Sequence, residues 1–243
     1  MRALVAALIL ASTLAGCEEE PLAPSAKAAL ADVVVEAPGH TGDGLLDSGH
    51  AVDGVHGQGA AAGNGDDVFS LGYEAGADDR VVLAWSGRRV RNGAGADFAV
   101  FENAFLVAGG PEAFMDLAIV YLSRDGESWV AFPHDYLADD ETAYSALAED
   151  WPGFAGAAPV LLNDDTNPVD PFDAAAAGGD QFDLDALPDE GEAAAIKAEG
   201  FRYLRIVSAP AEINPDTGAP FVHDPIGNGA DIDGVYGRYL EPM

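Results

Sequence analysis

One long segment of this 243-residue chain is acidic and carries no positive side chain. Residues 125–196 contain eighteen aspartates and glutamates and no lysine or arginine. Two like charges about 4 Å apart repel by about 1 kcal/mol in water and by about 4 kcal/mol near a protein surface. A compact fold therefore has three ways to carry these acids: it binds divalent cations, it works in high salt, or it holds the acidic loops out in solvent.

Calcium is the cation that best matches these side chains, because it takes about six to eight oxygen ligands in flexible geometry. Aspartate and asparagine are dense between residues 163 and 183, and further acids flank the apolar runs near residues 100 and 232. The candidate ligands are Asp97, Glu102, Asn103, Asp164, Asp170, Asp173, Asp180, Asp183, Asp231 and Asp233. An EF-hand starting at Asp231 is excluded, since Tyr236 and Pro242 stand where that loop needs glycine and glutamate. The alternative is that these acids only form solvated loops.

The histidines give a weaker metal signal. His50 and His56 lie in a glycine-rich stretch rather than on one face of a helix, so we expect both to be solvated and zinc binding to be disfavoured. The remaining histidines are His40, His134 and His223. The sequence has no Gly-x-Ser-x-Gly nucleophile elbow, which leaves paired carboxylates as the only machinery for catalysis. We predict that the protein is not an enzyme, with a carboxylate-dependent glycoside hydrolase as an alternative.

Aromatic side chains decide whether the protein could recognise a ligand by ring stacking. Trp151 lies in the loop sequence Trp-Pro-Gly-Phe, which makes it the first candidate to face a ligand, and Tyr136 is a second. The alternative is that Trp151 anchors its loop to the body of the domain.

Short β-type runs, separated by loops rich in Gly, Asp and Pro, must position these residues. The expected strands are Asp32–Glu36, Val68–Leu71, Arg80–Trp85, Asp97–Glu102, Leu117–Ser123, Ser128–Phe132, Phe201–Val207 and Ile232–Tyr236. Residues 117–122 are apolar on both alternating faces, as is typical of a strand covered on both sides. Helical periodicity is weak: Glu141–Ala148 and Glu192–Ala198 are candidates for two helical turns each, with irregular chain as the alternative for both. The pattern predicts an all-β sandwich rather than an α/β sheet.

Two segments resemble the discoidin-type jelly roll. The run 120–129 places Asp125-Gly126 between two β-type stretches, a strong hairpin signal, and ends in Trp129. The run Phe201-Arg202-Tyr203-Leu204-Arg205-Ile206 is similar to the Arg-Tyr-x-Arg strand that follows later in that fold, and residues 231–235 resemble its closing strand. The resemblance implies a galactose-binding-like jelly-roll β-sandwich, in which a structural calcium is common.

A further resemblance covers most of the chain. The runs Asp97–Phe105 and Gly178–Leu184 are similar to the Asp-Phe-x-Val-Phe-Glu-Asn strand and the Gly-Gly-Asp-x-Phe-Asp-Leu loop of a family of bacterial cell-surface lipoproteins. This resemblance implies surface exposure and the same sandwich, but no settled activity. The chain departs from the family pattern at Asp185–Gly200 and at Ala209–Gly229, which weakens any transfer of site geometry.

The N-terminus predicts export and lipid attachment. A cationic start is followed by an apolar run, Ala3–Leu14, that is too short to span a bilayer and fits a signal-peptide core. It ends in Leu-Ala-Gly-Cys, which resembles a bacterial lipobox with Cys17, the only cysteine, as the lipidated residue. We therefore expect a signal peptide at 1–16, a tether at 17–30 and a β-sandwich domain with long acidic loops at 31–243.

The overall charge narrows the class of function. Eleven Lys and Arg against 42 Asp and Glu give a net charge of −31, which excludes nucleic-acid binding through a general basic surface. Membrane contact is expected only through the lipid anchor, at the outer membrane or cell surface. We predict a non-catalytic, calcium-stabilised recognition or adhesion module for a glycan or protein ligand. The alternative is a structural component of the envelope or matrix.

Overall fold

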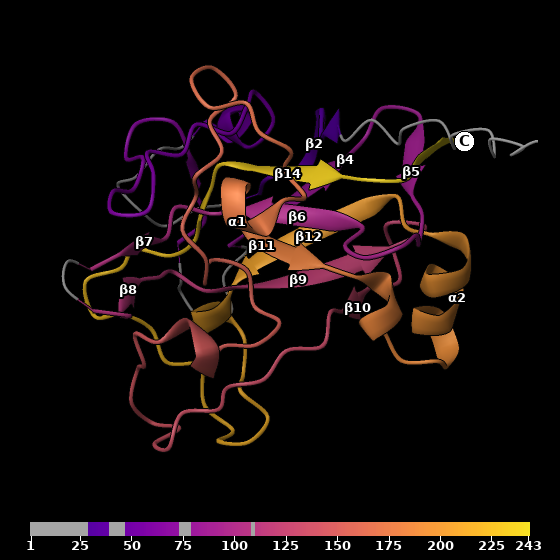
Figure 1. The fold of residues 1–243 in the computed structure, drawn as a ribbon. Coiled ribbons are helices and arrows are strands. Elements are labelled where there is room, and N and C mark those ends of the chain that lie inside the picture. Colours follow the sequence, from indigo (N-terminus) through magenta and orange to yellow (C-terminus); the bar gives the residue numbers. More distant parts are fainter. Residues whose placement is uncertain (1–28, 39–46, 73–78, 108–109) are drawn as a thin grey trace, which may run out of the picture.

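The computed structural model describes residues 29–38, 47–72, 79–107 and 110–243, which form an all-β sandwich of antiparallel sheets (Figure 1). One sheet has the strand order β1-β14-β6-β11 and the other has the order β10-β9-β12-β4-β2. The first comprises β1 (Ala29–Leu30), β14 (Gly234–Gly237), β6 (Phe98–Phe101) and β11 (Asp180–Phe182). The second comprises β10 (Val130–Ala131), β9 (Ala118–Ser123), β12 (Tyr203–Ser208), β4 (Arg80–Ala84) and β2 (Val33–Glu36).

Three two-stranded ladders and several helical turns complete the described chain. The ladders pair β13 (Asp231–Ile232) with β3 (Phe69–Ser70), β15 (Leu240–Pro242) with β5 (Arg88–Val90), and β7 (Phe105–Leu106) with β8 (Ala113–Phe114). The helices are α1 (Ala174–Ala177) and α2 (Gly191–Glu199), and the 3₁₀ turns are η1 (Ser48–Ala51), η2 (Ala148–Asp150), η3 (Leu184–Ala186) and η4 (Ala209–Ala211). Within the described ranges, no helix combines the length and the apolar character needed to cross a membrane.

The inner faces of the two large sheets enclose one apolar core. Phe98 and Val100 of β6 pack in it with Leu204 and Ile206 of β12. The ring of Phe98 stacks on that of Phe182, with ring centroids 4.8 Å apart. Side chains alternate along a strand, so the residues between these core positions point away from the core.

Loops cover the outer faces of both sheets. On β6, the outward Ala99 and Phe101 pack against loop residues that include Val160 and Leu162. On β9, the outward Ile119 belongs to a separate apolar cluster built mainly from the loops 113–117 and 136–157. Both central strands are therefore buried on two sides, which confirms the interpretation of their continuous apolar runs.

Each of the eight expected strands is present, with differences at the ends. The run Ile232–Tyr236 is divided at Asp233, so that β13 joins the small ladder with β3 and β14 joins the large sheet. The family-like loop at 178–184 contains a further strand, β11, which the sequence pattern did not indicate. The expected helix Glu192–Ala198 lies within α2.

The other candidate helix, Glu141–Ala148, takes the irregular alternative. Residues 141–147 form turns and irregular chain, and only Ala148 begins the 3₁₀ turn η2. Asp140 accepts hydrogen bonds from the backbone N–H and the hydroxyl of Thr142. Such local side-chain bonds favour a turn over a helix.

The domain begins earlier than its expected boundary at residue 31. Ala29 and Leu30 pair with Gly237 and Tyr236 as strand β1. The indole of Trp85 also donates a hydrogen bond to the carbonyl of Ala29, at 2.8 Å. The signal peptide, Cys17, the rest of the expected tether and His40 lie outside the described residues.

Candidate functional site

The predicted calcium ligands do not converge on one site. Asp97 has no exposed surface, and its two oxygens accept N–H groups from Gly93 at 2.7 Å and Leu184 at 2.8 Å. Burial raises the pKa of Asp97 to about 6, although the two backbone hydrogen bonds lower it. Asp97 therefore links the segment that leads into β6 to the turn η3 through hydrogen bonds to both.

Asp170, Asp173 and Asp183 shape turns. Asp170 and Asp183 each accept the backbone N–H two residues later, at 3.0 Å and 2.9 Å. Asp173 is the N-cap of α1 and accepts the N–H of Ala176. Each of these carboxylates stabilises the loop that carries it.

Asp180 holds a loop against β11. One of its oxygens accepts the N–H groups of Gly156 at 2.7 Å, Ala157 at 3.1 Å and Ala158 at 3.4 Å. These hydrogen bonds lower the pKa of Asp180, but burial outweighs them and raises it to about 7. This carboxylate therefore fixes residues 156–158 beside the sheet.

A buried carboxylate cluster, made of Glu102, Asp116 and Asp231, lies at the end of β6. Glu102 is 2% exposed, and its Oε1 accepts the N–H of Asp231 at 3.0 Å. Among the described residues, Glu102 Oε2 is buried without a hydrogen-bond partner. Burial raises the pKa of Glu102 well above its usual value, and the charges of Asp116 and Asp231 raise it further. The cluster concentrates negative charge where water cannot screen it.

The predicted ligands Glu102, Asn103 and Asp231 meet in this cluster. Asp116 also belongs to it but was not predicted from the sequence. Burial and the charges of Asp231 and Asp224 together raise the pKa of Asp116 to about 7. The predicted Asn103 donates a side-chain hydrogen bond to Asp231, which also accepts one from the hydroxyl of Ser70. In the sequence, Asp116 is a single acid among apolar residues just before β9. This isolation is the signal by which it could have been identified as a buried carboxylate.

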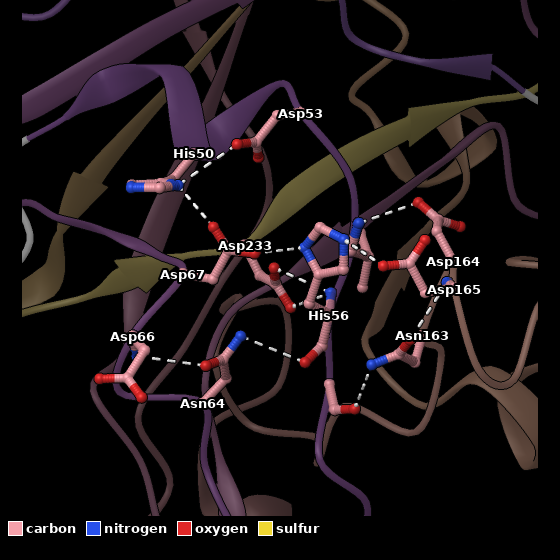
Figure 2. Close-up of polar contacts among 12 residues, drawn as sticks. His50, Asp53, His56, Asn64, Asp66, Asp67, Asn163, Asp164, Asp165 and Asp233 are labelled. Carbon is pink, nitrogen blue, oxygen red and sulfur yellow. Dashed lines mark hydrogen bonds and ion pairs between the residues drawn. The ribbon is translucent and has the colours of Figure 1, made fainter.

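A second polar group lies in and beyond η1, and we call it the histidine–aspartate centre (Figure 2). His50 Nδ1 lies 2.5 Å from Asp67 Oδ1 and 3.3 Å from Asp53 Oδ2. The ligand atoms of His50, Asp53 and Asp67 all lie within 4.8 Å of one another. The other oxygen of Asp67 lies 2.6 Å from Nδ1 of His56. The expectation that both histidines are solvated is wrong, since their side chains are only 26% and 21% exposed.

Two more of the predicted ligands, Asp164 and Asp233, fix the backbone of the histidine–aspartate centre. Both oxygens of Asp233 accept the backbone N–H of His56, at 3.1 Å and 3.0 Å. Asp164 accepts the N–H of Val55 at 2.9 Å and the hydroxyl of Tyr236 at 2.8 Å. Burial and the charges of the nearby aspartates together raise the pKa of Asp233 to about 8. These contacts tie residues 55–56 to strand β14.

A groove of about 560 Å³ opens beside β11 and the Trp151 loop, and we call it the aromatic groove. Trp151 and Tyr136 are only 1% and 4% exposed, so the expectation that they offer an exposed stacking surface is wrong. Their rings stack with centroids 3.9 Å apart, and the Trp151 indole donates a hydrogen bond to the Ser145 carbonyl at 2.9 Å. Trp151 instead anchors its loop. The groove walls include Phe132, Pro133, Phe154, Gln181 and Asp183.

No family model, curated protein or solved structure matches the chain.

Proposed function

We propose that the protein is a lipid-anchored envelope lipoprotein whose sandwich acts as a non-catalytic recognition module, with a neutral glycan bound in the aromatic groove. The observation that carries this proposal is the groove itself. Its volume of about 560 Å³ lies within the range of small-ligand sites. The exposed Pro133, Pro152 and Ala186 give the groove an apolar surface that suits the C–H faces of a sugar. The half-buried Gln181 and Asp183 offer hydrogen bonds to hydroxyl groups.

The charge of the groove favours an uncharged ligand. Its lining includes the carboxylates of Asp180 and Asp183 and contains no Lys, Arg or His. An acidic polysaccharide would meet like charge there, and the net charge of −31 adds to that repulsion.

The same two carboxylates argue against hydrolysis. Asp180 is held by three backbone N–H groups, and Asp183 caps the turn η3. A glycoside hydrolase needs one carboxyl group to donate a proton and another to act as a base or nucleophile. Both carboxylates of the groove serve as structural acceptors instead, which supports a role in binding without catalysis.

We further propose that calcium stabilises the domain at the buried carboxylate cluster. Glu102, Asp116 and Asp231 supply hard oxygen donors, the type that calcium prefers. The buried Glu102 Oε2, which lacks a hydrogen-bond partner among the described residues, supports this placement. A cation there would offset charges that burial otherwise penalises, and binding to the native state would raise the melting temperature.

A blocked-groove variant tests the recognition role. Ala186 is an exposed residue of the lining, so Ala186→Trp should fill the groove without entering the core. Ala175→Trp, exposed on α1 outside the groove, is the matched control. On an array of neutral and acidic glycans, the full chain should bind a neutral glycan, Ala186→Trp should lose at least about tenfold in affinity, and Ala175→Trp should bind normally.

Three results would overturn this assignment. The first is an array on which no glycan binds. The second is a glycan that binds Ala186→Trp as tightly as it binds the wild type. The third is a protein that binds the wild type and Ala175→Trp but not Ala186→Trp, because the ligand of the groove would then be a protein rather than a glycan. Calcium is tested separately: melting in EDTA and in excess calcium should differ, and equal midpoints would contradict the calcium site.

A further inference from the structure

We propose that His50, Asp53 and Asp67 bind one borderline divalent metal ion of the zinc type, with His56 holding the far oxygen of Asp67. This site is separate from the aromatic groove and from the buried carboxylate cluster, so it stands or falls independently of the proposed function. It also reverses the expectation, drawn from the glycine-rich local sequence, that these histidines are solvated.

The donor set and its spacing fit such an ion. Imidazole nitrogen with carboxylate oxygen is a characteristic ligand combination for zinc, whereas calcium takes oxygen ligands. With metal–ligand distances of about 2.0–2.2 Å, neighbouring ligand atoms in a tetrahedron lie about 3.3 Å apart. His50 Nδ1 and Asp53 Oδ2 are 3.3 Å apart, and all three ligand atoms lie within 4.8 Å of one another. His50 Nδ1 and Asp67 Oδ1 are 2.5 Å apart, so Asp67 must shift outward by about 0.8 Å when the ion binds.

One carboxylate joins the two rings. Nδ1 of His50 and Nδ1 of His56 lie 2.5 Å and 2.6 Å from the two oxygens of Asp67. Both nitrogens are buried atoms, and among the described residues neither contact meets hydrogen-bond geometry. A metal ion on Nδ1 of His50 would take the place of a proton shared with Asp67, while His56 keeps the other oxygen of that carboxylate.

Charge balance leads to the same conclusion. The carboxylates of Asp53 and Asp67 would place two negative charges on a bound ion, and one divalent cation neutralises both. Asp165 Oδ2 lies 3.9 Å from Nε2 of His56, and Figure 2 shows it on the side of the ring away from Asp67. Carboxylates beyond the ligands commonly orient metal-site histidines in this way.

The backbone around the centre is fixed independently of any ion. Asp47 caps η1 by accepting the N–H of Gly49 at 2.9 Å, and this turn carries His50. Asp233 holds the N–H of His56, as described above. The donors therefore sit on braced segments, so little ordering is needed when a metal binds.

Calorimetric titration of the full chain with zinc chloride, in buffer containing calcium, tests the site. We expect one zinc per chain in the wild type. Asp67→Asn and His50→Gln should each weaken zinc binding by more than about a hundredfold, since even groups beyond the ligands change metal affinity by about 10–100-fold. Asp66→Asn, the neighbouring aspartate, should leave binding unchanged. Cobalt bound in place of zinc should give a visible absorption band that Asp67→Asn and His50→Gln abolish and Asp66→Asn retains.

Three outcomes would overturn the proposal. Zinc binding that Asp67→Asn and Asp66→Asn weaken equally would indicate only a diffuse acidic surface. Wild-type affinity in His50→Gln would exclude the histidine as a ligand. Displacement of zinc by an equal concentration of calcium would make the metal class wrong. Melting of each variant in EDTA verifies folding, and His50→Gln alone decides the question if Asp67→Asn does not fold.

Discussion

Glu102→Gln should change how the stability of the metal-free protein depends on pH. The folded state raises the pKa of Glu102 well above the value of about 4.5 in an unfolded chain, because the side chain is buried near Asp116 and Asp231. The folded protein therefore keeps a proton on Glu102 that the unfolded chain releases as the pH rises above that value. Stability from this group is full at low pH and falls as pH increases.

The size of the effect follows from proton counting. One proton retained only by the native state changes the free energy of unfolding by about 1.4 kcal/mol per pH unit. From the usual pKa of a glutamate up to the raised pKa of folded Glu102, the wild type should therefore lose stability at up to this rate as the pH rises. Glutamine has nearly the same shape and does not titrate, so the stability of Glu102→Gln should fall less steeply over the same interval.

Urea unfolding in EDTA, followed by tryptophan fluorescence at three pH values, measures this difference. Glu127→Gln, at an exposed position of the hairpin, is the matched control and should follow the wild type. In saturating calcium the order should reverse, because Glu102→Gln removes a proposed ligand. The reasoning is refuted if the stability of Glu102→Gln follows that of the wild type at every pH in EDTA.

Three further predictions concern the anchor and the backbone. Asp97→Asn should lower the free energy of unfolding by about 1–3 kcal/mol in urea titrations, because an amide NH₂ would face a buried N–H donor, whereas the exposed Asp139→Asn should have little effect. Gly153→Ala should destabilise far more than Gly87→Ala in thermal melts. Both have positive φ, but a Cβ at Gly153 would lie 2.0 Å from a carbonyl oxygen and one at Gly87 would meet nothing within 4 Å; equal losses would contradict this. Cys17→Ser should abolish incorporation of labelled fatty acid and release the protein from the membrane fraction, and unchanged labelling would exclude the lipobox.

The sandwich was predictable because its signals are local. Continuous apolar runs such as 117–122 mark strands buried on both faces, and Asp125-Gly126 marks the hairpin between β9 and β10, where Gly126 has φ of 83°. Strand β11 was missed because its two glycines read as a loop, although both have positive φ and lead directly into the strand.

The grouping of the acids was not predictable from their spacing. Asp164 and Asp233 are far apart in the sequence, yet they brace the same histidine–aspartate centre because β14 passes beside the loop that carries His56. Acids of the segment 125–196 also accept local hydrogen bonds. Backbone N–H groups lower the pKa of Asp125, and the hydroxyl and backbone N–H of Thr142 lower the pKa of Asp140. Turn geometry of this kind depends on the local conformation of each loop rather than on the spacing of the acids.

Strand β1 has a mechanical consequence. A pull applied upstream of Ala29 enters the domain at an edge strand of two residues, Ala29–Leu30, paired only with β14. The first contacts to yield would be those two rungs and the bond from the Trp85 indole to the Ala29 carbonyl. After this short edge is released, the tension would pass through residues 31 and 32 to β2, the edge strand of the five-stranded sheet.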